Sequence, residues 1–403
     1  MSRTRAERIL STTDARRRAR KALPRALFDY IDGGAEEEAT LAANVRAFQE
    51  HAIRPRVGIA VEEPNMTTTV LGTPLALPVL LAPCGMVQLV HPDGAVGVAR
   101  AASAAGTVAV LSRTAMCPPE EVGQRSPGPN WFHVNSAGGR DAVKRDMARA
   151  AESGFEGLVV TLDGPPPGNR EGESRHGLVP PIRLTPQFTA HLAAHFVARP
   201  RWVASMLLAA RQQISTIKRA STLLSSGTLH RSARFTWADI EWMRSEWADS
   251  LLVKGVLSGH DAIAARDVGA DAVIVSNHGG RALDGAPATM RVLPEIVAAV
   301  GPETEVLLDG GVRRATCVIK ALSLGARAVL IGRPFVYGLA FAGQPGVERI
   351  IEIFRSELAR NMKLMGCAAL SELNPSWLQP SHLPPVAAAS RLQWPNPSPE
   401  SAP

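Results

Sequence analysis

Short apolar runs alternate with amphipathic stretches along most of the chain. The runs recur eight times, at Val79–Ala82, Thr107–Leu111, Trp131–Val134, Gly157–Thr161, Leu251–Lys254, Ala272–Val275, Glu305–Leu308 and Ala328–Ile331. Most are separated by stretches of helical length, which include Gly94–Ala105, Gly139–Ser153, Ala238–Trp247, His260–Val268, Met290–Val300 and Arg314–Leu324. Strands that alternate with helices form parallel sheets, and eight such units favour a closed barrel over an open doubly wound sheet. We therefore predict an α/β fold, the (β/α)8 TIM barrel.

Three segments flank or interrupt the predicted barrel, which we place at residues 77–375. Residues 1–76 begin with a charged helical pattern and are predicted to form an N-terminal helical segment that packs on the barrel. Residues 376–403 are rich in proline, serine and alanine, which predicts a disordered tail. Residues 171–234 separate the fourth and fifth runs and are too long for a simple connector.

We expect the 171–234 segment to be a long strand-4 loop that acts as a lid over the barrel mouth. A disordered insert is the alternative interpretation. The segment also holds an apolar patch, Val203–Ala210, beside basic residues. Because basic amphipathic segments can lie on anionic lipid, a peripheral membrane contact through this segment stays open.

Composition narrows the class of ligand and the compartment. The 403 residues carry a formal net charge of +7, which favours an anionic ligand. Only two tyrosines are present and the arginines are scattered, so we expect no nucleic-acid partner. The four cysteines form no CxxC pair, so neither a metal site nor a disulfide framework is expected, and a cytoplasmic location is the simplest interpretation. No apolar run reaches the roughly 18 residues of a membrane span, and the arginine-rich N-terminus does not resemble a secretory signal.

Polar and glycine residues collect where the apolar runs end. Active sites of barrels of this type lie at the carboxyl ends of the strands. The residues at these ends are Cys84, Gly85, Ser112, His133, Asn135, Thr161, Asp163, Lys254, Ser276, His278, Asp309, Gly332 and Arg333, and Arg170 follows closely after the fourth end. We therefore expect them to surround one site.

The glycine-rich loop Ser276–Arg281 follows the sixth run. A histidine there can move protons near neutral pH, and an arginine can hold a carboxylate with two parallel hydrogen bonds. His278 and Arg281 therefore predict an acid-oxidising site. Asp163 is the expected partner that fixes the imidazole, although a helix cap or turn carboxylate is its plainer interpretation.

Two further groups at the strand ends predict a cofactor. Lys254 ends a buried run, and a buried ammonium requires an anionic partner, which a reduced flavin would supply. The loops after the last two runs carry Gly311, Arg313, Gly332 and Arg333. Such loops commonly hold a phosphate in this fold, and the pair of arginines favours that interpretation over solvated helix-start residues.

These motifs resemble the FMN-dependent α-hydroxy acid oxidases and dehydrogenases, a family that includes glycolate oxidase, L-lactate dehydrogenase and mandelate dehydrogenase. The resemblance rests on Ser276–Arg281 with the following Leu283-Asp284 and Pro287–Thr289, on Leu307–Arg314, and on Ile331–Pro334. It extends over about residues 20–375.

The resemblance implies a role for each residue of the predicted site. His278 would be the base and Asp163 its partner, while Tyr30, Arg170 and Arg281 would hold the substrate carboxylate. FMN would contact Cys84, Gly85, Ser112, His133, Thr161, Lys254, Ser276, Asp309, Gly311, Arg313, Gly332 and Arg333. A small L-2-hydroxy acid would be oxidised to the 2-oxo acid, and oxygen, a quinone or another electron acceptor would then reoxidise FMN. The resemblance also implies a homo-oligomer, a tetramer.

The third run departs from the family pattern. It carries His133 and Asn135 where the family usually has glutamine and then tyrosine. Asn135 can still donate a hydrogen bond to the substrate, with a shorter reach, so we expect a wider pocket. Oxidation of an amino-acid- or peptide-derived group in a cofactor or natural-product pathway, as in mycofactocin maturation, is therefore the alternative function. A flavin-binding module without turnover is a third interpretation.

Overall fold

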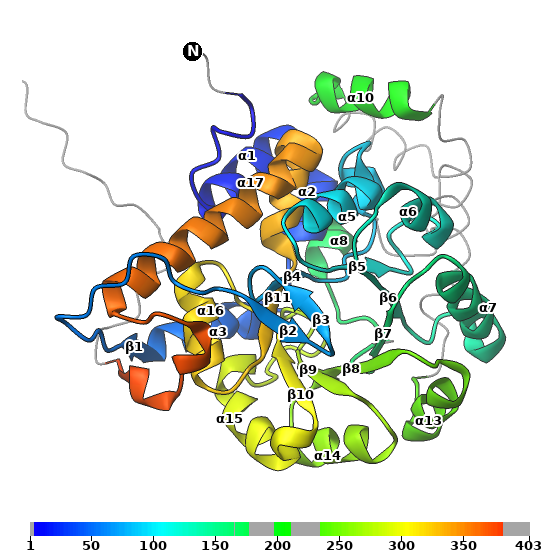
Figure 1. Cartoon of the computed structure of the whole chain (residues 1–403). Coiled ribbons are helices and arrows are strands. Elements are labelled where there is room, and N and C mark those ends of the chain that lie inside the picture. Colours follow the sequence, from blue (N-terminus) through cyan, green and yellow to red (C-terminus); the bar gives the residue numbers. More distant parts are fainter. Residues whose placement is uncertain (1–3, 165, 177–196, 211–233, 382–403) are drawn as a thin grey trace, which may run out of the picture.

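The computed structural model describes residues 4–164, 166–176, 197–210 and 234–381. Within these ranges, eight parallel strands close into a barrel in the order β10-β11-β4-β5-β6-β7-β8-β9 (Figure 1). The barrel strands are β4 (Val79–Leu81), β5 (Ala109–Ser112), β6 (Asn130–Val134), β7 (Gly157–Thr161), β8 (Ser250–Val256), β9 (Ala272–Val275), β10 (Glu305–Leu308) and β11 (Ala328–Ile331). The predicted (β/α)8 barrel is confirmed, with each strand within a few residues of its apolar run.

The apolar runs show no alternation because both faces of each strand are buried. One set of side chains, which includes Leu80, Val159 and Ile274, fills the inside of the barrel. The neighbouring residues face the surrounding helices. A hairpin of β2 (Thr68–Val70) and β3 (Thr73–Leu75) adds Val70 and Leu75 to the interior cluster. The hairpin thus closes one end of the barrel, and the site must open at the other.

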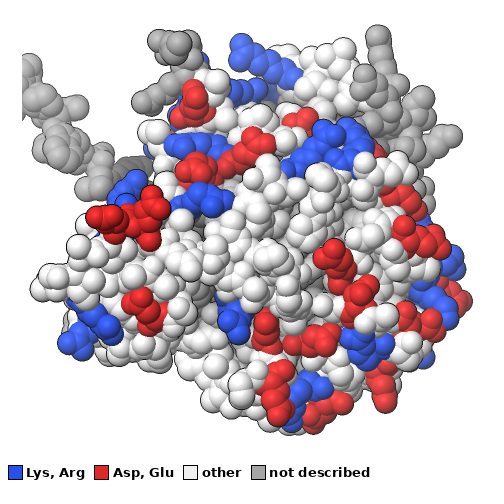
Figure 2. Space-filling view, viewed as in Figure 1, with Lys and Arg blue, Asp and Glu red and all other residues white. Residues whose placement is uncertain are grey.

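The surrounding helices are α4 (Val87–Val90), α5 (Gly94–Ala104), α6 (Pro119–Arg125), α7 (Gly139–Glu152), α13 (Trp237–Glu246), α14 (Gly259–Asp267), α15 (Thr289–Val300), α16 (Ala315–Ser323) and α17 (Arg333–Met365). Of these, α5, α7, α13, α14, α15 and α16 match the predicted amphipathic stretches. α17 is broken at Ala342 and Gly343, whose backbone angles are not helical. On the face in Figure 2, basic and acidic side chains are interspersed rather than gathered into a stripe of one sign.

The N-terminal segment contains α1 (Thr12–Ala22), α2 (Arg25–Asp32) and α3 (Ala39–Ala47). α1 packs against α17 (Figure 1). α3 is tied to the loop after β9 by a reciprocal pair of amide hydrogen bonds between Asn44 and Asn277, at 2.8 and 2.9 Å. The segment therefore reaches the carboxyl ends of the strands.

The prediction of a disordered tail from residue 376 places its start too early. Leu378–Pro380 forms a strand, β12, that pairs with β1 (His51–Ile53). Trp377 is 1% exposed, and the guanidinium carbon of Arg56 lies 3.9 Å from the centre of its ring. Pairing with β1 and burial of Trp377 order these residues despite their proline-rich composition. Residues 382–403 lie outside the described part.

Most of the predicted lid, residues 177–196 and 211–233, also lies outside the described residues. Its described parts include α8 (Glu171–Arg175) and α10 (Pro200–Ala210). α10 is held by a hydrogen bond from Trp202 Nε1 to the carbonyl of Val90, and Arg199 donates to the carbonyl of Leu23. Across the described residues, we find no helix whose length and apolar character would let it cross a membrane.

Candidate active site

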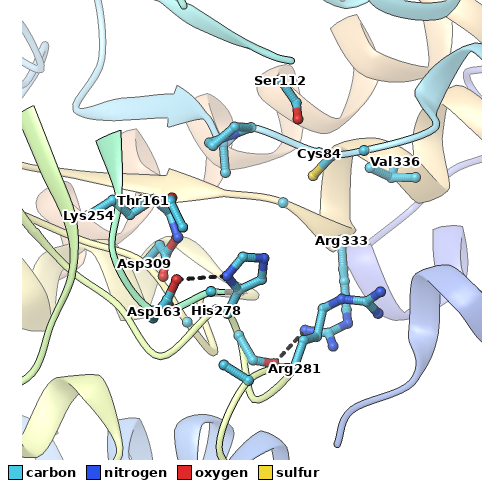
Figure 3. Close-up of a pocket in the computed structure, with 18 of the residues that line it drawn as sticks. Cys84, Ser112, Thr161, Asp163, Lys254, His278, Arg281, Asp309, Arg333 and Val336 are labelled. Atoms are coloured by element: carbon cyan, nitrogen blue, oxygen red, sulfur yellow. Dashed lines mark hydrogen bonds and ion pairs between the residues drawn. The ribbon is translucent and has the colours of Figure 1, made fainter. Parts of the chain in front are cut away.

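One cavity of about 290 Å³ lies at the carboxyl ends of the strands, near the lower end of the size range of small-molecule sites, about 300–1,000 Å³. Its lining includes every predicted site residue except one. Figure 3 shows part of this lining, with His278, Asp163 and Lys254 among the labelled residues. The exception is Ser276, which is fully buried behind Lys254 and accepts a hydrogen bond from its ammonium group at 2.7 Å. Ser276 supports a lining residue and does not itself face the cavity.

His278 and Asp163 form the predicted pair. Nδ1 of His278 lies 2.9 Å from Oδ1 of Asp163 (Figure 3). Since an ionised carboxylate only accepts hydrogen bonds, Nδ1 carries the proton and Nε2 is left as an acceptor. Burial by itself would raise the pKa of Asp163, but the charge and hydrogen bond of His278 and the charge of Lys254 outweigh burial and lower it. Asp163 therefore stays ionised and holds the imidazole in one tautomer.

Local backbone geometry brings this pair together. His278 has a left-handed backbone, with φ of 57°, which turns it out of the line of β9. Gly255 in β8 has φ of 105°, and a Cβ there would lie 2.9 Å from the Cβ of Asp163. A side chain at this position of β8 would displace the carboxylate, so glycine is required by the close approach of Asp163.

Lys254 has an anionic partner within the chain, which the sequence analysis did not predict. Its Nζ lies 2.9 Å from Oδ2 of Asp309, and both side chains are buried. Burial by itself lowers the pKa of Lys254, but the carboxylates of Asp309 and Asp163 outweigh burial and raise it. The chain itself thus supplies an anionic partner for this ammonium, because β10 lies beside β9 and brings a carboxylate to the same strand-end layer.

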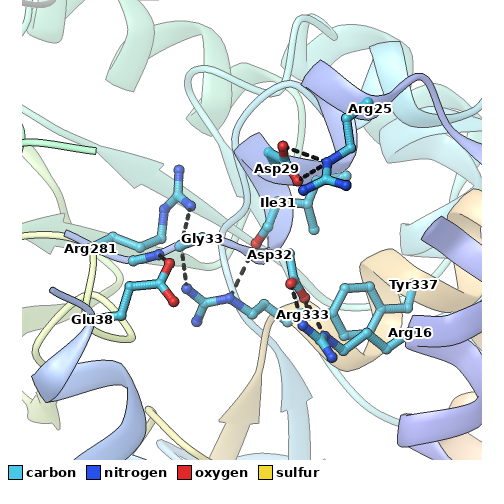
Figure 4. Close-up of polar contacts among 11 residues, drawn as sticks. Arg16, Arg25, Asp29, Ile31, Asp32, Gly33, Glu38, Arg281, Arg333 and Tyr337 are labelled. Atoms are coloured by element: carbon cyan, nitrogen blue, oxygen red, sulfur yellow. Dashed lines mark hydrogen bonds and ion pairs between the residues drawn. The ribbon is translucent and has the colours of Figure 1, made fainter. Parts of the chain in front are cut away.

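The predicted carboxylate clamp is assembled, and it contains one residue that the sequence analysis missed. Nη1 of Arg281 donates to the carbonyl of Tyr30 at 2.6 Å. It also donates to the carbonyl of Gly33 at 3.0 Å (Figure 4). Its Nη2 lies 2.9 Å from Oε1 of Glu173, and Nε of Arg170 lies 3.0 Å from the same oxygen. Glu173 is 4% exposed. The helical i, i+3 spacing from Arg170 was the available signal for this contact.

Tyr30 lies against the clamp. Its ring centre is 4.9 Å from the guanidinium carbon of Arg281. Burial raises the pKa of the phenol, which stays protonated and able to donate. A Cβ on Gly85 would lie 3.0 Å from the Tyr30 hydroxyl and 2.8 Å from Oγ1 of Thr114, so glycine leaves room for both groups.

The two predicted phosphate arginines differ in their contacts. Arg333 donates to the carbonyls of Ile31, Gly33 and Gly279, which ties the end of α2 to the start of α17 (Figure 4). Burial lowers its pKa to about 10. The guanidinium of Arg313, within the described residues, donates only to the carbonyl of Val312.

The glycines of these loops also differ. A Cβ on Gly311 would lie 2.2 Å from the carbonyl oxygen of Asn44, so the packing of α3 requires glycine there. A Cβ on Gly332 would meet Sγ of Cys84 at an ordinary contact distance of 3.5 Å. Gly332 directly precedes α17. The first backbone N–H groups of a helix have no partner within the helix.

The wall formed by β5, β6 and β7 is polar. Nε2 of His133 lies 2.9 Å from Oγ1 of Thr161. Its Nδ1 is buried and has no hydrogen-bond partner among the residues that the structure describes. Burial, with the charges of Lys254 and His278, lowers the pKa of His133 to about 3, so this imidazole is neutral. Oδ1 of Asn135 accepts from the backbone of Ala137, which leaves its NH₂ group without a partner among the described residues.

This lining fits FMN, a flavin that carries a phosphate group. Oδ1 of Asp309 and Nδ1 of His133 are buried polar atoms without hydrogen-bond partners in the described part of the chain, and both residues line the cavity. Arg313 and the N-terminus of α17 supply donors for an anion at one end. The pair of His278 and Asp163 lies at the same cavity. The fold and the lining together define a barrel enzyme with residues suited to both a cofactor and a small anion.

Comparison with known proteins supports this assignment. The family model described as FMN-dependent dehydrogenase matches residues 19–380. An L-lactate dehydrogenase of Caulobacter sp. (strain K31) is 39% identical over 380 residues, which cover 92% of this chain and 98% of the relative. A pre-mycofactocin synthase of Mycobacterium tuberculosis (strain ATCC 25618 / H37Rv) is 39% identical over 375 residues, or 90% and 92% of the two chains. The crystal structure of a monotopic membrane protein, (S)-mandelate dehydrogenase, matches this structure with a TM-score of 0.84 and 32% sequence identity. The match covers 92% of this chain and 99% of that chain.

The chain belongs to the FMN-dependent dehydrogenase family. It is an oxidoreductase whose cofactor is FMN, so the resemblance and the cofactor predicted from its sequence are confirmed.

Proposed function

We propose that this enzyme oxidises a small L-2-hydroxy acid to the corresponding 2-oxo acid. The observation that carries the proposal is the pair of His278 and Asp163 facing the clamp of Arg281, Arg170 and Tyr30 in one cavity. A base and an anion clamp in one site are what a substrate with a carboxylate next to a hydroxyl-bearing carbon requires. The relatives act on lactate and (S)-mandelate by name, which supports the same class of substrate.

Each residue has a defined task in this proposal. Arg281, Arg170 and Tyr30 hold the carboxylate, and Asn135 donates its amide group to the substrate. Nε2 of His278 accepts the proton that leaves the hydroxyl-bearing centre, and Asp163 stabilises the resulting imidazolium.

The remaining predicted residues surround the cofactor. When bound, FMN would supply the two-electron acceptor, and oxygen, a quinone or another acceptor would take up the electrons afterwards. Lys254 places a positive charge beside it, and Arg313 with the start of α17 binds its phosphate. Its other contacts are with Cys84, Gly85, Ser112, His133, Thr161, Asp309, Gly311, Gly332 and Arg333, and Ser276 acts indirectly by orienting Lys254.

Anaerobic titration of the FMN-loaded enzyme tests the proposal. The flavin absorbance should bleach with members of a panel of L-2-hydroxy acids and persist with their D-enantiomers. A His278→Ala variant should retain FMN and lose the bleaching. Bleaching by no L-2-hydroxy acid of the panel would contradict the proposal.

A second candidate is the oxidation of an amino-acid- or peptide-derived group. The similarity to a pre-mycofactocin synthase favours it, as does the strand β6 with His133 and Asn135 in place of the usual residues. A peptide-derived substrate that bleaches the flavin when the acids do not would favour this candidate over the first.

The assembly and surface contacts stay proposals as well. The resemblance supports a homotetramer, which sedimentation velocity would test. Leu207 and Leu208 on α10 are 63% and 67% exposed. One relative of known structure, (S)-mandelate dehydrogenase, is a monotopic membrane protein, which supports peripheral membrane contact through residues 171–234. Co-sedimentation with anionic vesicles, lost in a Leu207→Ser/Leu208→Ser variant, would be the expected result. A cytoplasmic location also stays a prediction.

A further inference from the structure

The carboxylate clamp contains its own anion. Oε1 of Glu173 lies 2.9 Å from Nη2 of Arg281 and 3.0 Å from Nε of Arg170. The Glu173 side chain is 6% exposed, and the residue lines the same cavity as both arginines. One carboxylate therefore lies between two cations at the place where a substrate carboxylate is expected.

The two cations would oppose one another without this carboxylate. Burial lowers the pKa of Arg170, and the neighbouring charge of Arg281 lowers it further. A like-charged pair with little water around it is unfavourable unless an anion is shared. Glu173 supplies that anion from α8, one helical turn beyond Arg170.

Donor counting shows that the clamp keeps capacity for a ligand. An arginine has five N–H donors. Arg281 uses one for each of three acceptors, the carbonyls of Tyr30 and Gly33 and the carboxylate of Glu173, which leaves two. Two arginines and one glutamate carry a net charge of +1. The other buried ion pair of the cavity, Lys254 with Asp309, is balanced within itself.

We infer that Glu173 is a positioning and specificity-determining residue, which holds Arg281 and Arg170 side by side and sets the charge of the clamp to +1. The inference rests on the proposed function, because it takes the two arginines to be the carboxylate-binding end. The site then matches a substrate with a single carboxylate there and disfavours one with a second anionic group beside it. A second carboxylate beside the two arginines would be repelled by Glu173, which already shares their charge.

Two probes of nearly the same shape test this inference. Oxalate carries two carboxylates, and oxamate carries one carboxylate and one neutral amide. Their dissociation constants are measured from changes in the visible spectrum of FMN in the loaded enzyme. In Glu173→Gln, which keeps the size and an acceptor oxygen but removes the charge, the affinity for oxalate relative to oxamate should rise at least tenfold.

Two further variants separate charge from structure. Glu171→Gln is the control on the same helix, because Glu171 is half exposed and pairs with Arg175 at 2.9 Å. Its oxalate-to-oxamate ratio should stay within twofold of the parent value. Glu173→Asp keeps the charge on a shorter side chain and should also keep the parent ratio, which covers the case in which Glu173→Gln does not fold.

The outcomes distinguish this inference from the proposed function. A parent enzyme whose flavin spectrum responds to neither probe would overturn the carboxylate clamp itself. A parent that binds both probes, with a Glu173→Gln ratio within twofold of the parent ratio, would overturn only the role of Glu173. If Glu173→Asp changed the oxalate-to-oxamate ratio as much as Glu173→Gln does, the proposed role of Glu173 would also be overturned, because the charge would not be the cause.

Discussion

Nδ1 of His278 lies 2.9 Å from Oδ1 of Asp163, although 115 residues separate them in the chain. Asp163 follows β7, and His278 follows β9. β8 lies between these strands, and its Gly255 leaves the space through which the carboxylate approaches. The pair therefore depends on three successive strands of the closed barrel rather than on one loop.

Replacement of Asp163 by asparagine should slow the anaerobic reduction of FMN by an L-2-hydroxy acid by about 10²–10⁴-fold, because the imidazole loses its fixed tautomer and the charge that stabilises the imidazolium. Stopped-flow absorbance measures the rate, and the FMN content should match that of the parent. A rate within threefold of the parent rate would contradict the orienting role.

His133 should make the protein sensitive to acid. Its pKa falls from 6.5 to about 3 on folding, so the unfolded chain binds a proton at a higher pH than the folded chain. Stability is therefore lost as pH falls from 6.5 toward 3, by about 1.4 kcal/mol per pH unit from this one group. Between pH 7 and pH 5, the parent should lose about 2 kcal/mol more of its unfolding free energy than His133→Gln. Equal losses in urea unfolding would show that His133 is not buried in its neutral form.

Arg313 and Arg333 should differ in what their loss does. Arg313→Ala should weaken FMN binding roughly tenfold or more, with little change in the thermal midpoint of the FMN-free protein, because its described protein contact is one neighbouring carbonyl. Arg333→Ala should lower that midpoint as well, since three partly buried carbonyls lose their donor. Fluorescence titration and thermal unfolding measure the two effects. An unchanged FMN affinity in Arg313→Ala would rule out its contact with the phosphate.

Gly311 and Gly285 form a matched pair, because both have φ of 80°. A Cβ on Gly285 would meet no atom within 4 Å, whereas one on Gly311 would lie 2.2 Å from the carbonyl oxygen of Asn44. Gly285→Ala should therefore cost about 1–2 kcal/mol from backbone strain alone. Gly311→Ala should cost clearly more, because α3 must also move. Similar losses of stability in the two variants would show that α3 does not depend on Gly311.

Much of the fold could be predicted because local pattern is enough for strands that are buried on both faces. Ala272–Val275 and Glu305–Leu308 are strands with the predicted bounds. The rule that sites lie at the carboxyl ends of barrel strands then brought Lys254, His278 and Arg333 to one cavity, as expected. The start of the tail was wrong, because the order of Leu378–Pro380 comes from pairing with β1 and not from its own composition.

The sequence by itself determined the barrel, the family and most of the residues that line the cavity, because periodicity, glycine-rich loops and strand-end residues are local features. Only the tertiary structure decided which charges meet: Asp309 balances Lys254, and Glu173 joins Arg170 to Arg281. It also decided that Ser276 lies behind Lys254 and not at the cavity surface. The physical reason is that charge pairing depends on distances of a few ångströms between residues far apart in the chain. Those distances are set by the register of the barrel strands and by the docking of the N-terminal helices.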